Sequence, residues 1–132
     1  MMVVMFGDHQ PSVETEFYEQ LYGMRWTEIP GEQKIQSFKT PYMIWTNYDR
    51  ETTETGDMSA FMLGSQVLEE AGMAQTGLFA AANLLMENYD AVHAMGILDK
   101  QGNFYDGREQ GIHDQFSDIR AFHVLQYYEI FE

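Results

Sequence analysis

The sequence contains no cysteine among its 132 residues, so it can form no disulfide, thiolate nucleophile or cysteine-based zinc site. Basic residues are also scarce: 7 lysines and arginines stand against 21 acidic residues, which gives a formal net charge of -14. Such a chain has no basic stripe with which to bind nucleic acid or to dock directly on anionic lipid. No apolar run approaches the ~20 residues of a membrane span, and residues 1–6 are too short for a signal peptide.

Apolar side chains, in contrast, are plentiful. Hydrophobic residues make up 45% of the chain and aromatic residues 14%, which excludes a disordered protein. The length suits one domain or a large piece of one, and no repeat or interdomain linker is visible. We therefore treat residues 1–132 as a single domain or domain fragment.

The first apolar run, residues 2–6, stops at Gly7 and passes directly into Asp8 and His9. Five large apolar residues before a glycine predict a strand buried on both faces, as in a parallel sheet covered by helices. Asp8 and His9 would then lie beyond the carboxyl end of that strand, where open α/β sheets bind their ligands. Neighbouring side chains of a strand point to opposite faces, so the pair can converge on one ion only if the chain turns, which Gly7 permits.

Helix signals come next. Residues 12–23 have Ser12 as a candidate N-cap, acidic residues in the first turn and Gly23 at the left-handed C-terminal position. Val13, Phe17 and Leu21 recur at helical spacing, so one face of this helix is expected to be buried.

Three further helices are expected. One begins at Ser59 and ends near Gly72, a second covers residues 77–88, and a third covers residues 112–131 at the C-terminus. The second is apolar nearly all round, which predicts burial between layers.

A second apolar run at residues 41–47 predicts another strand, central or nearly so in its sheet. Residues 24–40 are interpreted as a loop, with one or two helical turns at residues 32–38 as the alternative, and residues 48–57 as an exposed loop. Residues 91–98 and 104–105 have the form of a β-hairpin joined at residues 99–103, and this pair is antiparallel. The expected fold is thus α/β, with a mixed, partly parallel sheet, packed helices, and a C-terminal β-hairpin and helix.

The run Val3-Val4-Met5-Phe6-Gly7-Asp8-His9-Gln10-Pro11-Ser12, followed by Phe38-Lys39-Thr40-Pro41-Tyr42-Met43-Ile44-Trp45, resembles the C-terminal part of lipoteichoic-acid-synthase-like phosphoglycerol transferases. These belong to the sulfatase and alkaline phosphatase superfamily. The hairpin around residues 99–105 and the closing residues 125–128 are also similar to the tail of these proteins. The resemblance runs over nearly the whole chain, although its one chemically specific motif is short.

The resemblance implies that Asp8 and His9 bind a catalytic divalent ion, with Mn²⁺ favoured and Mg²⁺ or Zn²⁺ as alternatives. It also implies that the family's threonine nucleophile and remaining ligands lie upstream, so this chain has two metal ligands, no catalytic nucleophile and no assigned substrate-binding residue. The expected partner is the upstream remainder of the catalytic domain. The parent would be anchored at the extracellular face of a bacterial membrane and act on phosphate or sulfate esters, whereas the isolated chain would be inactive and bind the ion weakly.

Plainer interpretations remain open. Asp8 can cap the following helix while His9 is an ordinary turn residue. His93, His113, His123 and Lys39 are interpreted as structural or solvated residues, and residues 99–103 as a turn, because they lack the carboxylate spacing of a calcium-binding loop.

The rival function is a non-catalytic binding or assembly module that has kept only this part of the fold. A truncated sheet leaves an apolar edge strand unpaired, which predicts a homo-oligomer.

Overall fold

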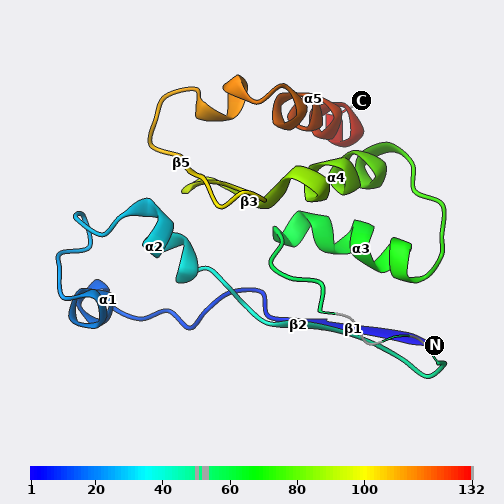
Figure 1. Ribbon diagram of the computed structural model, residues 1–132, viewed down its shortest axis with the longest axis horizontal. Coiled ribbons are helices and arrows are strands. Elements are labelled where there is room, and N and C mark those ends of the chain that lie inside the picture. The colour runs from blue at the N-terminus through cyan, green and yellow to red at the C-terminus, as the bar shows by residue number, and fades with distance from the viewer. Residues whose placement is uncertain (50, 52–53, 132) are drawn as a thin grey trace.

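The computed structural model describes residues 1–49, 51 and 54–131 (Figure 1). Its helices are α1 (Thr15–Tyr22), α2 (Gly31–Gln36), α3 (Leu63–Glu70), α4 (Gly77–Asn88) and α5 (Ser117–Phe131), with short 3₁₀ helices η1 (Ala60–Met62) and η2 (Ile112–Gln115). Its strands are β1 (Met2–Phe6), β2 (Tyr42–Thr46), β3 (Tyr89–His93), β4 (Gly96–Asp99) and β5 (Phe104–Asp106). The expected mixture of helices and strands is confirmed.

The described strands form two separate sheets, and within each sheet every pair of neighbouring strands is antiparallel. β1 pairs with β2 in a two-stranded ribbon whose register places Met2 opposite Thr46 and Phe6 opposite Tyr42. β3, β4 and β5 form a three-stranded meander in that order. The expected partly parallel sheet is therefore wrong for the described chain. A continuous apolar run predicts a strand, but it does not determine whether the neighbouring strand is parallel or antiparallel.

The hydrophobic core lies between the meander and the later helices. Figure 1 shows α5, α4 and α3 stacked in that order, with the β1–β2 ribbon beneath α3. Buried side chains from η1, α4, β3, β4 and α5 fill this space: Met62, Ala82, Leu85, Tyr89, Val92, Ile97, Ile119 and Phe122. The ribbon and α1 contribute no residue to this cluster, so they lie outside the main core.

The ribbon has an apolar face that is open to solvent. Its register places Met5 opposite Met43 and Val3 opposite Trp45, so these four side chains share one face. Met5, Met43 and Trp45 are about half exposed, at 59%, 50% and 46%. The expectation that residues 2–6 are buried on both faces, and that residues 41–47 form a central strand, is wrong here: among the described residues the ribbon has two strands, and its Met5, Met43 and Trp45 face is open to solvent.

The first helix shows the same discrepancy. Its predicted end is confirmed, because Gly23 has a left-handed φ of 68° at the C-cap. Its predicted start is wrong: α1 begins at Thr15, and the N-cap position is held by Glu14, not Ser12. The apolar stripe of Val13, Phe17 and Leu21 is exposed instead of buried.

Two other predictions are corrected at the meander and beside it. The supposed loop at residues 24–40 contains α2, where Gly31 lies so close to β5 that a Cβ there would be 2.8 Å from the Phe104 ring. Residues 91–98 are not one strand but parts of β3 and β4, joined by a tight turn before Gly96.

The remaining elements agree more closely with expectation. The bounds of α4 are those predicted, although only Ala82 and Leu85 are buried in it, and Phe79 and Leu84 are exposed. The helix expected from Ser59 is η1 followed by α3, and the C-terminal helix is preceded by η2. In the loop expected at residues 48–57, residues 50 and 52–53 lie outside the described residues. None of the described helices is long and apolar enough to cross a membrane.

Candidate functional site

Asp8 and His9 follow β1 directly and place their side chains together. The Asp8 Oδ2 atom lies 3.3 Å from His9 Nε2, and both side chains are open to solvent, at 81% and 77% exposure. The backbone N–H of His9 also donates to Asp8 Oδ1 at 2.9 Å. The chain therefore turns after Gly7 enough to bring the Asp8 carboxylate and the His9 imidazole into contact, as two ligands of one metal ion would require.

The other ring nitrogen of His9 defines how the ring is oriented. His9 Nδ1 lies 2.9 Å from the carbonyl oxygen of Gln10. A carbonyl oxygen can only accept, so this contact requires a proton on Nδ1. In the neutral ring Nε2 then carries a lone pair beside the Asp8 carboxylate, and the two atoms together can share a proton or a metal ion. Metal-binding histidines commonly donate their second N–H to a backbone carbonyl in this way.

The turn is held by the segment that leads into β2. Gly7 N–H donates to the Pro41 carbonyl at 3.0 Å, and the Thr40 hydroxyl donates to the Gly7 carbonyl at 2.7 Å. A Cβ on residue 7 would lie 2.9 Å from the Thr40 Cβ. Gly7 is not among the glycines with a positive φ, so it serves close approach to Thr40 and not a left-handed turn.

A cleft of about 420 Å³ opens beside this turn. Its lining joins residues from distant parts of the chain, and the polar or titratable ones among them are Asp8, His9, Gln10, Lys39, Thr40, Tyr42, Asp57, Ser59, Asp90 and His93. Apolar side chains such as Phe38 and Phe61 make up much of the wall. An apolar cleft with a few convergent polar groups is the usual form of a small-molecule site.

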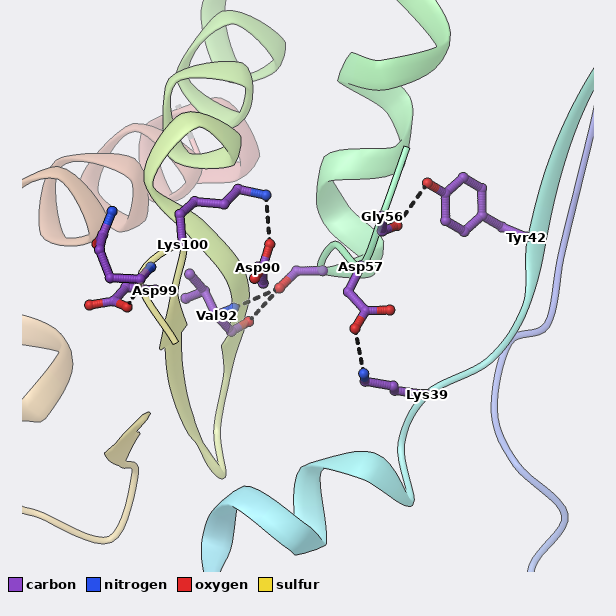
Figure 2. Close-up of polar contacts among 10 residues, drawn as sticks. Lys39, Tyr42, Gly56, Asp57, Asp90, Val92, Asp99 and Lys100 are labelled. Atoms are coloured by element: carbon purple, nitrogen blue, oxygen red, sulfur yellow. Dashed lines mark hydrogen bonds and ion pairs between the residues drawn. The ribbon is translucent and has the colours of Figure 1, made fainter. Parts of the chain in front are cut away.

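Contacts across the cleft hold its two walls together (Figure 2). Lys39, before β2, forms an ion pair with Asp57. Two residues further on, Ser59 Oγ accepts from the Val92 N–H at 2.7 Å and donates to the Val92 carbonyl at 3.1 Å. Ser59, which is predicted to begin a helix, thus hydrogen-bonds to β3 through its hydroxyl and does not cap η1 with its side chain.

His93 also lines the cleft, where it has structural contacts. The Met95 N–H donates to His93 Nδ1 at 3.1 Å, and the His93 and Phe38 ring centroids are 4.7 Å apart. Burial lowers the pKa of His93, which favours the neutral ring. Its interpretation as a structural histidine agrees with these contacts.

The other histidines lie elsewhere. The rings of His113 and His123 stack with centroids 5.8 Å apart on the C-terminal segment, and neither lines the cleft. Burial, and then the neighbouring His113, lower the pKa of His123.

The turn at residues 99–103 is confirmed as a structural one. The Asp99 carboxylate accepts from the backbone N–H groups of Gln101 and Asn103, at 3.0 and 2.8 Å, and from the side chains of Asn103 and Tyr105. These hydrogen bonds, that of the Asn103 side chain foremost, lower the pKa of Asp99. Its oxygens are occupied within the turn, which leaves no role as a metal ligand.

The donor set at Asp8 and His9 is one oxygen and one nitrogen. That combination suits Mn²⁺, Zn²⁺ or Mg²⁺, each of which takes four or more ligands. Within the part of the chain that the structure describes, no group of three or more histidine, aspartate or glutamate side chains is arranged to hold a metal ion. The pair therefore fits a metal site only as two of its ligands.

Asp8 and His9, predicted as metal ligands, line the cleft, whereas Asp57 and Ser59 were not predicted to reach it. Asp57 ends a polar stretch without a motif, and Ser59, predicted to begin a helix, contacts a residue 33 positions later in the chain. A single sequence carries no signal for such a contact.

No family model and no solved structure matches the chain. A protein of Rhizobium meliloti (strain 1021) with the name "Putative cyclic beta-1,2-glucan modification protein" is 24% identical over 104 residues. The similar segment covers 76% of this chain but 16% of that protein, so the chain spans a small part of the length of this curated relative.

Proposed function

We propose that this chain is the C-terminal part of a metal-dependent, sulfatase-like phosphoglycerol transferase or hydrolase that acts on phosphate or sulfate esters. The observation that carries the proposal is the His9 ring, which donates through Nδ1 to a backbone carbonyl and presents Nε2 beside the Asp8 carboxylate. That arrangement follows a strand and borders a cleft large enough for an ester headgroup.

The exposed apolar surfaces support a larger parent. The Met5, Met43 and Trp45 face of the ribbon and the Phe17 and Leu21 stripe of α1 are patterned for burial yet are open to solvent. Exposed apolar patches of this kind commonly mark an interface. The similarity to a much longer protein named for glucan modification is loosely compatible with a modifying enzyme.

In this proposal Asp8 and His9 each supply one ligand to a divalent ion, Mn²⁺ first and Mg²⁺ or Zn²⁺ as alternatives. When bound, such an ion lowers the pKa of a nucleophilic hydroxyl and neutralises charge on the transferred group. The contacts of Gly7 with Thr40 and Pro41 hold the two ligands at the rim of the cleft. The nucleophile and the remaining ligands come from the upstream remainder of the catalytic domain, with the parent at the extracellular face of a bacterial membrane.

The test uses the complete protein that the gene encodes. We expect Mn²⁺-dependent cleavage of a glycerophosphodiester or an aryl sulfate, measured as release of the alcohol. Asp8→Asn and His9→Gln should each reduce the rate by about 10²-fold or more, because the first replaces an anionic carboxylate ligand by a neutral amide and the second removes the imidazole ligand. His123→Gln is the matched control, since this histidine lies away from the cleft, and it should leave the rate unchanged. Full activity in Asp8→Asn would overturn the proposal.

A second candidate function is a self-associating assembly module, and the exposed ribbon face favours it. Antiparallel strands with unpaired edges and apolar side chains readily add further strands. A stop codon directly upstream, together with a dimer in size-exclusion chromatography that Trp45→Glu converts to a monomer, would support this function over the enzyme. A monomeric wild-type chain would count against it.

A further inference from the structure

Lys39 is the one lysine or arginine among the described residues that line the cleft. Its backbone is attached to the metal-ligand turn, because the Gln10 side-chain amide donates to the Lys39 carbonyl and the next residue, Thr40, donates to Gly7. The backbone of Lys39 is thus attached to the turn that carries Asp8 and His9.

The counter-ion of Lys39 comes from the opposite wall. Asp57 precedes η1, and the residues shortly before and after it, Gly56 and Ser59, hydrogen-bond to other elements. The Tyr42 hydroxyl donates to the Gly56 carbonyl at 3.1 Å, and Ser59 is bound to Val92 of β3 (Figure 2). The ion pair between Lys39 and Asp57 therefore spans the cleft from one fixed backbone segment to another.

This ion pair is also easily broken. The Lys39 and Asp57 side chains are 44% and 56% exposed, and ion pairs at such exposure contribute little stability and are screened by salt. A carboxylate oxygen on a lysine ammonium occupies the place that an oxygen of another anion would take. The lysine carries three donors, which suits an oxyanion with several acceptor oxygens.

We propose that Lys39 binds the tetrahedral oxyanion of a phosphate or sulfate ester in this cleft, and that the Asp57 carboxylate fills that place in the free protein until the ester displaces it. The inference rests on the proposed function for the kind of ester, but the anion contact itself requires only Lys39. Asp57 is then a built-in competitor, and its removal should strengthen anion binding.

A comparable lysine pair in the chain provides the matched control. Lys100 pairs with Asp90 at 2.6 Å, and their side chains are 37% and 32% exposed. Asp90 lines the cleft but Lys100 does not. A lysine that only supports the fold should behave like Lys100, and a lysine that binds the ligand should not.

The experiment is a titration of the ¹⁵N-labelled 132-residue chain with inorganic phosphate, in EDTA and at low salt, followed by ¹H–¹⁵N correlation spectra. We expect saturable shifts at residues 39, 57 and their neighbours. Lys39→Gln should weaken binding at least about tenfold, whereas Lys39→Arg keeps it within about threefold because the charge remains. Asp57→Asn should tighten binding about two- to fivefold, which corresponds to the loss of an exposed ion pair. Lys100→Gln should leave the titration unchanged.

Three results would overturn the inference. These are the absence of saturable shifts, an unaltered titration in Lys39→Gln, and weaker binding in Asp57→Asn, which would make Asp57 a support for Lys39 and not a competitor. Parallel titrations with glycerol 1-phosphate and methyl sulfate tell which ester is preferred. Because EDTA excludes metal ions, a positive titration together with no Asp8-dependent activity in the complete protein would reject the proposed function alone.

Discussion

The hydroxyl of Ser59 provides the most exact test of how the cleft is held together, because one atom makes two hydrogen bonds to one residue of β3. Ser59 Oγ accepts from the Val92 N–H at 2.7 Å and donates to the Val92 carbonyl at 3.1 Å. Val92 is 9% exposed, so water cannot readily replace the lost partner. The perturbation is Ser59→Ala, which removes only this hydroxyl.

The expected cost follows from these two bonds. Each is worth about 1 kcal/mol net, and an unpaired N–H near the core adds to the loss, so the free energy of unfolding should fall by about 2–3 kcal/mol. With a urea slope of about 2 kcal/mol per molar for a domain of this size, the midpoint should move down by about 1–1.5 M.

The assay is urea unfolding of the 132-residue chain followed by far-ultraviolet circular dichroism. Ser12→Ala is the control, because Ser12 is exposed and its side chain makes no hydrogen bond to any of the described residues, so its midpoint should change by less than about 0.25 M. A Ser59→Ala midpoint equal to that of the control would refute the reasoning that this hydroxyl fastens the Asp57 segment to β3.

Two further perturbations test other parts of the account. Arg108 donates to both oxygens of Asp106, and this hydrogen-bonded pair lowers the pKa of the Asp106 carboxyl from 3.8 to about 2. The stabilisation is present above pH ~4 and lost as the pH falls towards 2. Carboxyl NMR titration should therefore show the low pKa in the wild type and a higher one in Arg108→Gln, in which the backbone N–H of residue 108 still donates to the carboxylate. Gly7→Ala should lower stability by about 1–3 kcal/mol, because its Cβ would be placed 2.9 Å from the Thr40 Cβ. An unchanged thermal midpoint in Gly7→Ala would show that the turn accommodates a Cβ at residue 7 without strain.

Local sequence signals predicted local structure well. The limits of α4, the strands at β1 and β2, and the left-handed Gly23 at the end of α1 all follow from apolar periodicity and turn residues. These features depend on residues within a few positions along the chain, and a single sequence shows those residues directly.

Burial was predicted less well, for a physical reason. Apolar periodicity at Phe17 and Leu21, or at Met5 and Met43, indicates which face is made to be covered, but it does not say what covers it. In the described chain no layer lies on those faces. The wrong prediction of a parallel pairing has the same cause. A fully apolar run suits a strand of a parallel sheet, but it does not say which strand pairs with it, and β1 pairs antiparallel with β2.

The candidate site was predictable only in its local part. Gly7, Asp8 and His9 form a contiguous motif, so the adjacent carboxylate and imidazole could be identified from the sequence. The opposite wall could not, because Asp57 and Ser59 reach the cleft through contacts with Lys39 and Val92, 18 and 33 positions away.

The central claim is that Asp8 and His9 are two ligands of a metal site completed by residues outside these 132. The most direct measurement is Mn²⁺ affinity by isothermal titration calorimetry, on this chain and on the complete encoded protein. The account predicts weak binding to the chain, with a dissociation constant well above micromolar, and tight binding to the complete protein that Asp8→Ala abolishes. Sub-micromolar binding to the 132-residue chain that is lost in Asp8→Ala, or tight binding to the complete protein that survives it, would contradict the account.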